Sequence, residues 1–519
     1  MFRAIPPRIV ILVSTAAVVS FLVAGPVQAT DRHVPSPYAT IQAGISAAAD
    51  GDEVIIAPGT YQGDGNRDID FLGKAITVRS TDPDDPNLVA ATVIDCQADE
   101  SNHHRGFAFL GDEDANSVLA GLTIVNANVQ GDPNVDDWLD YSGGGILIAN
   151  YHSPVVRNCV IRDCVATYGG GIACLYDGGS PRIDGCTLIA NSAEFGGGIA
   201  SLSPDPIITN CTIIGNSAVG MSWPVPFGGG YDGFGGGGIV CGGEYSFAQI
   251  TNCTIVGNAC GTFGGGVSCF SGYSSVTVLT NCVLWGNTAG VGGPQLSLTG
   301  TFMMENGATA NAAYSDLQGG QGDVSQGPTA VLNWGDGNMD ADPLFVDPNG
   351  PDGDPNTWQD NDYHLSPNSP CINIGDPNGD YTGQTDIDGH PRVMDLRVDM
   401  GSDEYALCKL TLSIVNQPWG HVDVDPYAPG HIYEYETVVT LTGVANEGKV
   451  LKHWRIFDPN HPGDSNYAVN DSNNPLVLVM DRDHEVTTVF DCASGMGPFL
   501  PVIAAGLMGF VVRRRRWRR

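Results

Sequence analysis

The sequence is poor in basic residues. Lysine and arginine together number 23, against 58 aspartates and glutamates, which gives the 519-residue chain a formal net charge of −35. Arg3, Arg8 and the six arginines of residues 513–519 lie at the two ends, so the body between them is more acidic still. A body of this charge repels nucleic acid and anionic lipid, and it repels polyuronates unless cations bridge the two. The composition therefore argues against a nucleic-acid partner.

The 14 cysteines form no C-x-x-C pair. Structural zinc sites are usually built on such pairs, so the spacing argues against zinc. Glycine (69 residues) and proline (33 residues) are abundant instead, which favours a turn-rich all-β protein with more than one domain. Because 42% of the residues are apolar, we interpret the acidic charge as surface charge on packed structure and not as disorder.

One phrase recurs through residues 158–287. A cysteine begins a short apolar strand, and in the last four copies an asparagine follows it by five positions. The copies lie at Cys159, Cys186, Cys211, Cys253 and Cys282, with Asn191, Asn216, Asn258 and Asn287. The third step between cysteines is longer than the others, and we interpret it as a repeat that carries an insertion at Val219–Phe234. Glycine runs follow the first four copies. Apart from the long third step, the cysteines are 25 to 29 residues apart, and repeats of this length indicate a solenoid.

The repeat predicts stacked coils of short parallel strands about 4.8 Å apart. Alternation along a strand places Cys159 and Ile161 inward, so the five cysteines are expected to form a buried ladder that packs as small apolar side chains. The four asparagines are expected to form a second ladder, whose amides bond one another at a turn. A helix within residues 38–49 is expected to cap the first coil, whose edge would otherwise be exposed.

The phrase "YATIQAGISAAADGDEVIIAPGTY" and the repeats resemble secreted right-handed parallel β-helices of the pectin-lyase-like class. Residues 338–405, with "DYHLSPNSPCINIGD" and "DIDGHPRV", resemble a choice-of-anchor Q domain, which implies closure of the C-terminal end of the solenoid. Residues 410–490 resemble a divergent internalin-type B repeat, a small Ig-like or β-grasp-like module. A disulfide between Cys408 and Cys492 would join the two ends of this module.

Both ends of the chain resemble targeting segments. Arg3, Arg8 and the apolar run that ends before Ala29 are typical of a signal peptide. The apolar stretch of 494–512 is followed by an arginine-rich tail, which is similar to a C-terminal sorting signal or a membrane anchor with the body outside. The expected divisions are a signal peptide (1–29), the capped β-helix (30–325), the anchor-Q-like region (326–406), the B-repeat-like module (409–491) and the transmembrane or sorting segment (494–519).

Binding residues are predicted where the repeat is interrupted, because long loops on a rigid scaffold often carry function. The candidates are aromatic and acidic: Trp223, Phe227, Tyr231, Asp232 and Phe234 in the insertion, and Trp138 in an acidic loop. A second row of aromatics precedes the glycine runs, at Tyr168, Phe195, Phe234 and Phe263, and packing under the turn is its favoured interpretation.

Calcium is a candidate cofactor at residues 347–356. Asp347, Asn349, Asp352 and Asp354 supply oxygen atoms at the spacing of a calcium loop, but proline interrupts the loop and the acidic twelfth position of an EF-hand is missing. A solvated turn is the alternative.

A catalytic set is not identified. Residues 120–300 contain no lysine and only Arg157, Arg162 and Arg182, whereas a uronate lyase needs a basic residue beside calcium-binding carboxylates. We therefore expect an exported cell-surface β-helix with an adhesion, carbohydrate-binding or purely structural role. Its expected partners are a polysaccharide or surface glycan, a sorting enzyme and the membrane that holds its C-terminus. A pectate-lyase-like polysaccharide-degrading enzyme is the alternative, because the fold alone does not decide between them.

Overall fold

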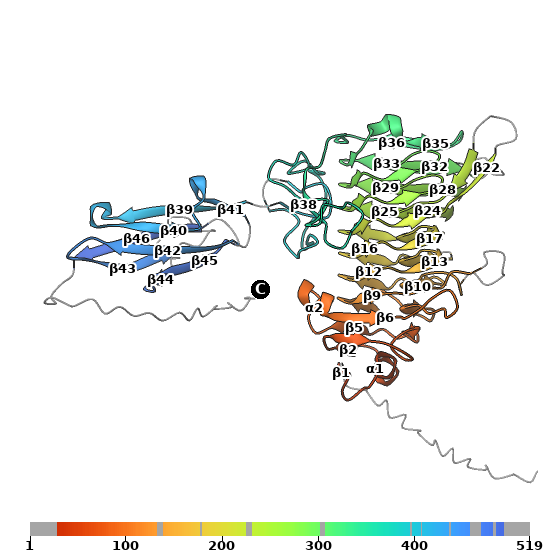
Figure 1. Cartoon of the computed structure of the whole chain (residues 1–519), viewed down its shortest axis with the longest axis horizontal. Helices are drawn as coiled ribbons and strands as arrows, with labels where there is room; N and C mark the ends of the chain where they lie inside the picture. The colour runs from red at the N-terminus through yellow and green to blue at the C-terminus, as the bar shows by residue number, and fades with distance from the viewer. Residues whose placement is uncertain are drawn as a thin grey trace, which may run out of the picture. The chain divides into compact units, whose positions relative to one another are not determined.

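The computed structural model describes residues 29–131, 139–176, 179–224, 231–300, 307–394, 397–405, 407–434, 437–456, 469–480 and 484–492. The chain divides into two compact units, Met1–Tyr405 and Ala406–Arg519. Figure 1 shows both units with their strands labelled. The predicted signal peptide and C-terminal segment lie outside the described residues. No helix within the described part of the chain has the length and apolar character needed to cross a membrane.

The first unit is a stack of coils, and each coil adds one strand to each of three long parallel sheets. The first sheet contains β1 (Asp31–Val34), β2 (Glu53–Ile56), β5 (Thr77–Ser80), β8 (Val118–Ala120), β11 (Val155–Arg157), β15 (Arg182–Asp184), β19 (Ile207–Thr209), β25 (Phe247–Thr251), β29 (Val276–Thr280), β33 (Thr309–Ala313) and β36 (Val331–Trp334). The second contains β3 (Gly59–Tyr61), β6 (Thr92–Asp95), β9 (Thr123–Val125), β12 (Val160–Arg162), β16 (Thr187–Ile189), β20 (Thr212–Ile214), β26 (Thr254–Val256), β30 (Val283–Trp285) and β34 (Asp316–Leu317).

The third sheet closes the coil. It contains β4 (Ile69–Asp70), β7 (Phe107–Phe109), β10 (Ile146–Ala149), β14 (Ile172–Leu175), β18 (Ile199–Leu202), β24 (Ile239–Glu244), β28 (Val267–Tyr273), β32 (Leu296–Gly300) and β35 (Ser325–Gln326). A shorter fourth sheet lies between the second and third along the chain, with β13 (Val165–Tyr168), β17 (Ser192–Phe195), β21 (Ser217–Ala218), β27 (Ala259–Cys260) and β31 (Thr288–Ala289). The first sheet continues to β36, past the predicted boundary at residue 325.

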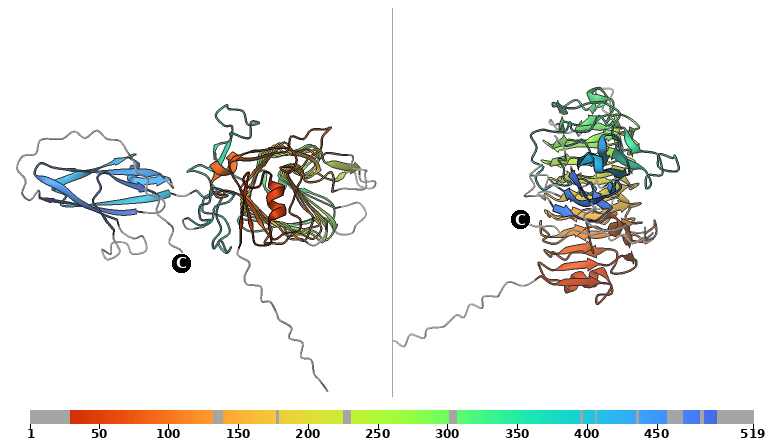
Figure 2. Two further views of the ribbon diagram at one scale, coloured as in Figure 1. Left: turned by 90° about the horizontal axis from the view of Figure 1, so that it is seen from below. Right: turned by 90° about the vertical axis from the view of Figure 1, so that its left-hand side faces the viewer.

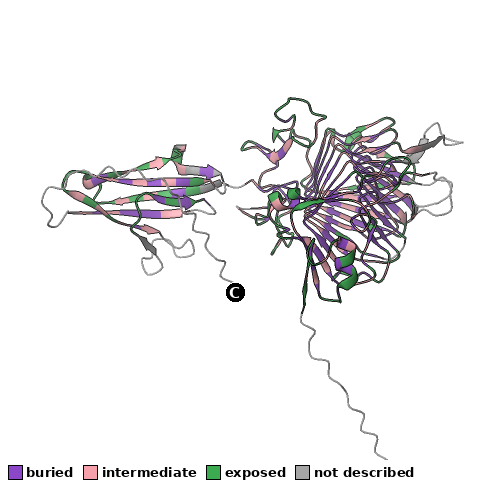
Figure 3. Ribbon diagram, turned by 60° about the horizontal axis from the view of Figure 1, so that its bottom comes forward, coloured by how far each residue is buried: buried purple, intermediate pink, exposed green. Residues whose placement is uncertain are grey.

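The inside of the coils is dry and apolar, as the buried inner faces in Figure 3 show. All five cysteines of the repeat are buried, and thiols such as that of Cys211 lie within hydrogen-bonding distance of backbone carbonyl oxygens. The helix α1 (Ile41–Ala47) covers the first coils with Ile41 and Ile45, and it is visible at the mouth of the stack in Figure 2. Thr40 caps this helix by accepting a hydrogen bond from the amide of Ala43. The predicted cap and thiol ladder are confirmed.

The asparagine ladder is also confirmed. The backbone amide and the Nδ2 of Asn191 both donate to Oδ1 of Asn216, at 3.0 and 2.9 Å. Asn216 binds Asn258 in the same way, and Asn258 binds Asn287, all at 2.9 Å. Each buried amide therefore satisfies the polar groups of the turn in the coil before it.

Residues 338–405, here called the lateral segment, correct one prediction. Met339 still pairs with Asp316 in the last coil, but the residues after it lie along the side of the stack, against the outer face of the second sheet (Figure 1). Tyr363 packs on Ile214 and Val256, and Met400 and Leu365 pack with Val283. The physical reason is that these coils carry apolar side chains on both faces of their strands, and the outward ones need a cover.

The remaining elements of the first unit are short. A hairpin of β22 (Met221–Pro224) and β23 (Tyr231–Phe234) forms the insertion, and β37 (Phe345–Asp347) pairs with β38 (Asp362–Leu365) in the lateral segment. The helix α2 (Pro86–Ala91) follows β5, and the 3₁₀ turn η1 (Gly320–Asp323) follows β34.

The second unit is a small β-sandwich, as predicted. Its larger sheet has the order β41 (Ile432–Glu434), β39 (Leu407–Val415), β46 (His484–Cys492), β43 (Lys449–Ile456) and β44 (Val469–Asp471). The smaller sheet contains β40 (Gly420–Asp425), β42 (Val438–Ala445) and β45 (Leu476–Val479), and the 3₁₀ turns are η2 (Gln417–Trp419) and η3 (Pro429–His431). Trp454, Leu441 and Val486 belong to the buried core of this unit.

The proposed disulfide between Cys408 and Cys492 does not fit this sandwich. Strands β39 and β46 run parallel, with Leu410 opposite His484 and Val415 opposite Val489. Cys408 is the second residue of β39 and Cys492 ends β46, so the register separates their backbones by about ten residues, roughly 33 Å along the strands. A disulfide requires the two Cα atoms to lie within about 7 Å.

Candidate functional site

The predicted binding residues of the insertion are only partly described. The backbones of Trp223 and Asp232 pair across the hairpin, and Met221 pairs with Phe234. The side chains of Trp223, Tyr231, Asp232 and Phe234 lie outside what the structure describes. Phe227 and Trp138 lie outside the described residues altogether, so their role in binding stays a prediction.

Three members of the aromatic row before the glycine runs, Tyr168, Phe195 and Phe263, pack as the favoured interpretation predicted, and the side chain of the fourth, Phe234, is not described. The rings of Tyr168 and Phe195 stack with centroids 5.2 Å apart and planes 18° apart. Phe195 and Phe263 are buried, and Phe195 also packs with Ala200 and Val240. These rings cover the turn between the fourth and third sheets.

The predicted calcium residues lie in an exposed turn. Oδ1 of Asp352 accepts a hydrogen bond from the amide of Asp354, whose own Oδ1 accepts one from the amide of Asn356. Asp347, Asn349, Asp352 and Asp354 are all exposed. Among the described residues, the acidic and histidine side chains that converge in groups of three lie elsewhere. Calcium at this turn stays a prediction.

The corner between the third and first sheets carries a row of exposed tyrosines that sequence reasoning missed. Tyr151 follows β10, Tyr176 follows β14 and Tyr245 follows β24, and they are 69%, 43% and 72% exposed. We call these three residues the corner row. Since β10, β14, β18 and β24 are consecutive strands of one sheet, Tyr151 and Tyr176 belong to adjacent coils, and Tyr245 lies two coils, about 10 Å, further along.

The backbone of the corner row is unusual. Its φ angles are 68°, 70° and 56° at Tyr151, Tyr176 and Tyr245, in the left-handed region that bulky residues rarely adopt. After β18, the residue in register with Tyr176 is Ser203, with φ of 84°. Strain of this kind is tolerated where the surrounding fold imposes it, and it often accompanies function. Unequal spacing hid this row in the sequence, because Tyr176 follows Cys174 by two positions and Tyr245 follows the equivalent Cys241 by four.

The three arginines of residues 120–300 are each paired with a nearby carboxylate. Their nitrogen–oxygen distances are 2.5 to 3.3 Å in Arg157–Asp84, Arg162–Asp163 and Arg182–Asp184. These pairs lie on the outside of three different strands or turns, and they do not bring a basic group together with a carboxylate set on the corner row.

A second group of histidine and aspartate side chains lies in the lateral segment. Two overlapping groups of side chains converge there, with donor atoms inside each group within 4.8 Å of one another. We call them together the histidine–aspartate cluster: His364, Asp386, Asp388, His390 and Asp403. His364 comes from β38, Asp386, Asp388 and His390 come from one turn, and Asp403 comes from the end of the segment, so only folding joins the turn to the other two residues.

Electrostatics in the cluster are dominated by carboxylates. Hydrogen bonds to Asp362 and Asp388 raise the pKa of His364 to about 11. Burial raises the pKa of Asp403 to about 6, although the amide of Leu365 donates to its Oδ2 at 2.7 Å. Just beneath, the fully buried guanidinium of Arg392 pairs with Glu404 at 3.0 Å.

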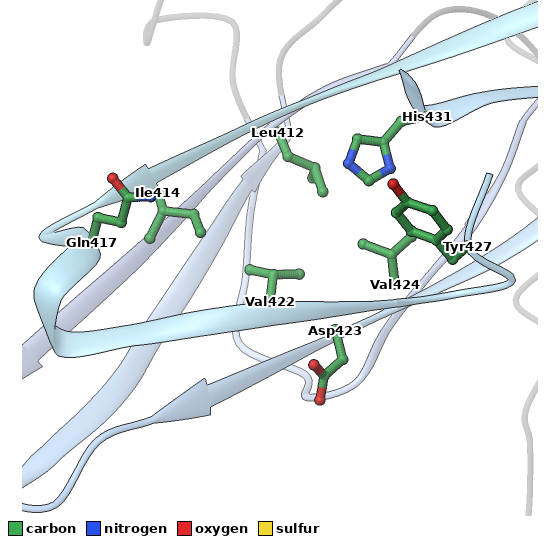
Figure 4. Close-up of a pocket in the computed structure, with 8 residues that line it drawn as sticks. All are labelled: Leu412, Ile414, Gln417, Val422, Asp423, Val424, Tyr427 and His431. Atoms are coloured by element: carbon green, nitrogen blue, oxygen red, sulfur yellow. The ribbon is translucent and has the colours of Figure 1, made fainter. Parts of the chain in front are cut away.

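The second unit contains an open groove of about 650 Å³, shown in Figure 4. Leu412, Ile414, Val422 and Val424 line it, between β39 and β40. The rings of Tyr427 and His431 meet edge to face at one end, with centroids 5.8 Å apart. Gln417, Asp423, Tyr427 and His431 also line it, so the surface of the groove is mainly polar.

Comparisons with known proteins bear on the fold. The family described as "Right handed beta helix region" matches residues 89–301. No curated protein matches the sequence.

Three solved structures illustrate the similarity. The crystal structure of pectate lyase Pel9A is 14% identical, with 70% of this chain and 90% of that chain covered and a TM-score of 0.39. The catalytic unit of a GH87 α-1,3-glucanase from Streptomyces thermodiastaticus is 14% identical, with 58% and 67% covered and a TM-score of 0.26. The A-module of a mannuronan C-5 epimerase from Azotobacter vinelandii is 13% identical, with 58% and 94% covered and a TM-score of 0.20.

These weak similarities transfer no activity to this chain. The family match and the three long parallel sheets agree on the architecture that the repeats predicted. The first unit of this chain is a right-handed parallel β-helix.

Proposed function

We propose that this chain is an exported cell-surface protein whose β-helix binds a neutral polysaccharide or surface glycan along the corner row. The single observation that carries the proposal is the placement of Tyr151, Tyr176 and Tyr245. Their exposed rings lie on one corner of a rigid stack, at intervals of one and two coils. Aromatic faces stack on apolar faces of sugar rings, and a row that runs along the stack suits an extended polymer.

Charge supports a neutral ligand. The chain carries a net charge of −35, so an anionic polysaccharide would be repelled unless cations lay between them. Phe247, two residues after Tyr245, is 42% exposed and extends the aromatic surface on the same coil.

The remaining parts of the proposal concern location. Residues 1–29 would direct export, and residues 494–519 would be read by a sorting enzyme or retained as an anchor. Residues 326–406 and 409–491 would serve as an anchor-Q-like region and a B-repeat-like spacer that hold the β-helix away from the cell. Their sequence resemblances support these roles.

The test is binding of the purified full chain to a panel of neutral and anionic polysaccharides, measured by affinity electrophoresis and calorimetry. Tyr176→Ser places at this position the residue that the next coil holds in register, Ser203, and Tyr151→Ser makes the same change one coil before. Each ring contributes roughly 1 kcal/mol, so each substitution is expected to weaken binding about fivefold. Leu344→Ser, at an exposed residue of the lateral segment with the same left-handed backbone, is the control and should bind as the unmodified chain does.

Two results would contradict the proposal. One is an absence of binding to every polysaccharide, and the other is binding that is unchanged in the double Tyr151→Ser, Tyr176→Ser variant. The same incubations, followed for new reducing ends or unsaturated products, test the alternative of a polysaccharide-degrading enzyme. Products released at a catalytic rate would favour that alternative over simple binding.

A further inference from the structure

The histidine–aspartate cluster differs from an ordinary acidic patch because imidazole nitrogens and carboxylate oxygens converge in it. Nε2 of His364 lies 2.9 Å from Oδ2 of Asp388, and Asp403 completes a group whose donor atoms all lie within 4.8 Å. Two ligands bound to one ion at about 2.1 Å and at right angles are roughly 3.0 Å apart. The separation of Nε2 and Oδ2 is therefore already that of neighbouring ligands on a metal ion.

The surroundings of His364 hold its ring in the orientation that a metal ligand needs. Its other nitrogen, Nδ1, lies 2.5 Å from Oδ1 of Asp362. Metal-binding histidines almost always donate their second ring nitrogen to a carboxylate or a carbonyl, which fixes the tautomer and aims the free nitrogen at the ion. The Asp362–His364 pair has this arrangement, and Nε2 points into the cluster towards Asp388.

The turn that carries Asp388 is fixed independently. Oδ1 of the buried Asp386 accepts hydrogen bonds from the amides of Asp388 and His390, at 3.0 and 2.7 Å. Oδ2 of Asp386 accepts one from the amide of Glu404, next to Asp403. One buried carboxylate thus holds the turn and the end of the lateral segment in register, so two of the three ligands are positioned before any ion binds.

Access and charge favour a cation. The side chains of His364 and Asp388 are partly exposed, so an ion can reach them from solvent, whereas Asp403 is buried. Carboxylates outnumber the basic groups in this part of the segment. They are Asp362, Asp386, Asp388, Asp399, Asp403 and Glu404, against His364, His390 and Arg392.

We propose that His364, Asp388 and Asp403 bind one divalent transition-metal ion, with Asp362 and Asp386 positioning them. One imidazole and two carboxylates suit zinc or manganese better than calcium, which prefers an all-oxygen shell of six to eight ligands. Three protein ligands leave a position for water or for a ligand oxygen. The site is separate from the corner row and does not depend on the glycan proposal.

The experiment titrates the chelator-treated full chain with Zn²⁺, Mn²⁺ and Ca²⁺ by calorimetry, with metal content measured after dialysis. One Zn²⁺ or Mn²⁺ per chain is expected, together with a rise in the unfolding temperature, because an ion that binds only the folded state stabilises it. His364→Gln and Asp388→Asn should each weaken binding more than tenfold. Asp362→Asn, which acts through His364, should weaken it about 10- to 100-fold.

Matched controls are Asp360→Asn and His421→Ala, two exposed side chains of the same chemical types outside the cluster. Both should bind metal like the unmodified chain. Circular dichroism and the unfolding temperature without metal show whether each variant is folded. The proposal is overturned if folded, unmodified protein shows no saturable binding, or if the His364→Gln and Asp388→Asn variants bind as tightly as the controls.

Discussion

Single buried polar side chains hold the coils in register. Asn216 both donates to Asn258 and accepts from Asn191, so each asparagine serves two turns at once. The sequence predicted this ladder because the spacing from each cysteine is constant. It could not predict the histidine–aspartate cluster, because His364, Asp388 and Asp403 are brought together only by the folding of an irregular segment.

Asp316 makes the stability of the first unit depend on pH. Burial raises its pKa from 3.8 to about 6, although its Oδ1 accepts a hydrogen bond from the amide of Ala341. Between about pH 4 and pH 6 the folded state keeps a proton that the unfolded chain has released. Its contribution is therefore fully present below pH 4 and is lost as pH rises through 6, by roughly 3 kcal/mol at most.

The variant Asp316→Asn should remove this part of the pH dependence, because the amide resembles the protonated acid. Urea unfolding at pH 4.5 and 7.5 measures it: the fall in the free energy of unfolding should be smaller in the variant than in the unmodified chain. Asp360→Asn, an exposed position, is the control. Parallel pH profiles for Asp316→Asn and the unmodified chain would show that Asp316 does not titrate in this way.

At the scale of elements, the lateral segment is the main departure from the sequence-based expectation. Its resemblance suggested an end cap, yet Ser402 bonds Thr212 and Thr254, and Tyr381 bonds Asn281, all on the side of the stack. The sequence did indicate a covered side, because apolar residues occupy outward positions in the later strands of the second sheet. Arg162 is outward in β12, whereas Ile214, Val256 and Trp285 occupy that position in β20, β26 and β30.

Glycines between these coils test the packing of the segment. A Cβ at Gly257 would lie 2.4 Å from the ring of Trp358, whereas one at Gly286 would meet nothing closer than 4.0 Å. Their φ angles are 64° and 65°, so the backbone strain of an alanine is the same at both. Gly257→Ala should therefore lower the free energy of unfolding by roughly 1–3 kcal/mol more than Gly286→Ala does.

Chemical denaturation of the two alanine variants gives this difference directly. Repeating both substitutions in a Trp358→Ala background supplies the control, because the clash is then absent and the two variants should be equally stable. Equal effects in the presence of Trp358 would mean that the lateral segment does not press on this face.

At the scale of the whole molecule, the two units have separate hydrophobic cores. Separate cores predict separate cooperative transitions. Calorimetry of the full chain should show two unfolding transitions, and a chain that ends at Tyr405 should keep the transition of the β-helix unchanged within about 2 °C. A single transition, or a truncated chain that fails to fold, would contradict this.

The lateral segment also affects the order in which the parts of the first unit fold. Neighbouring coils join residues a few tens of positions apart, but the bonds of the lateral segment join residues 100 to 190 positions apart. A chain made from its amino end can stack its coils before the lateral segment is made. Ile214 and Val256 are then exposed to water until Trp358 and Tyr363 cover them. Incomplete or slowly finished chains would therefore display an apolar stripe to chaperones and proteases. The part of this unit that is made last is therefore the part that buries the exposed apolar side chains of the earlier coils.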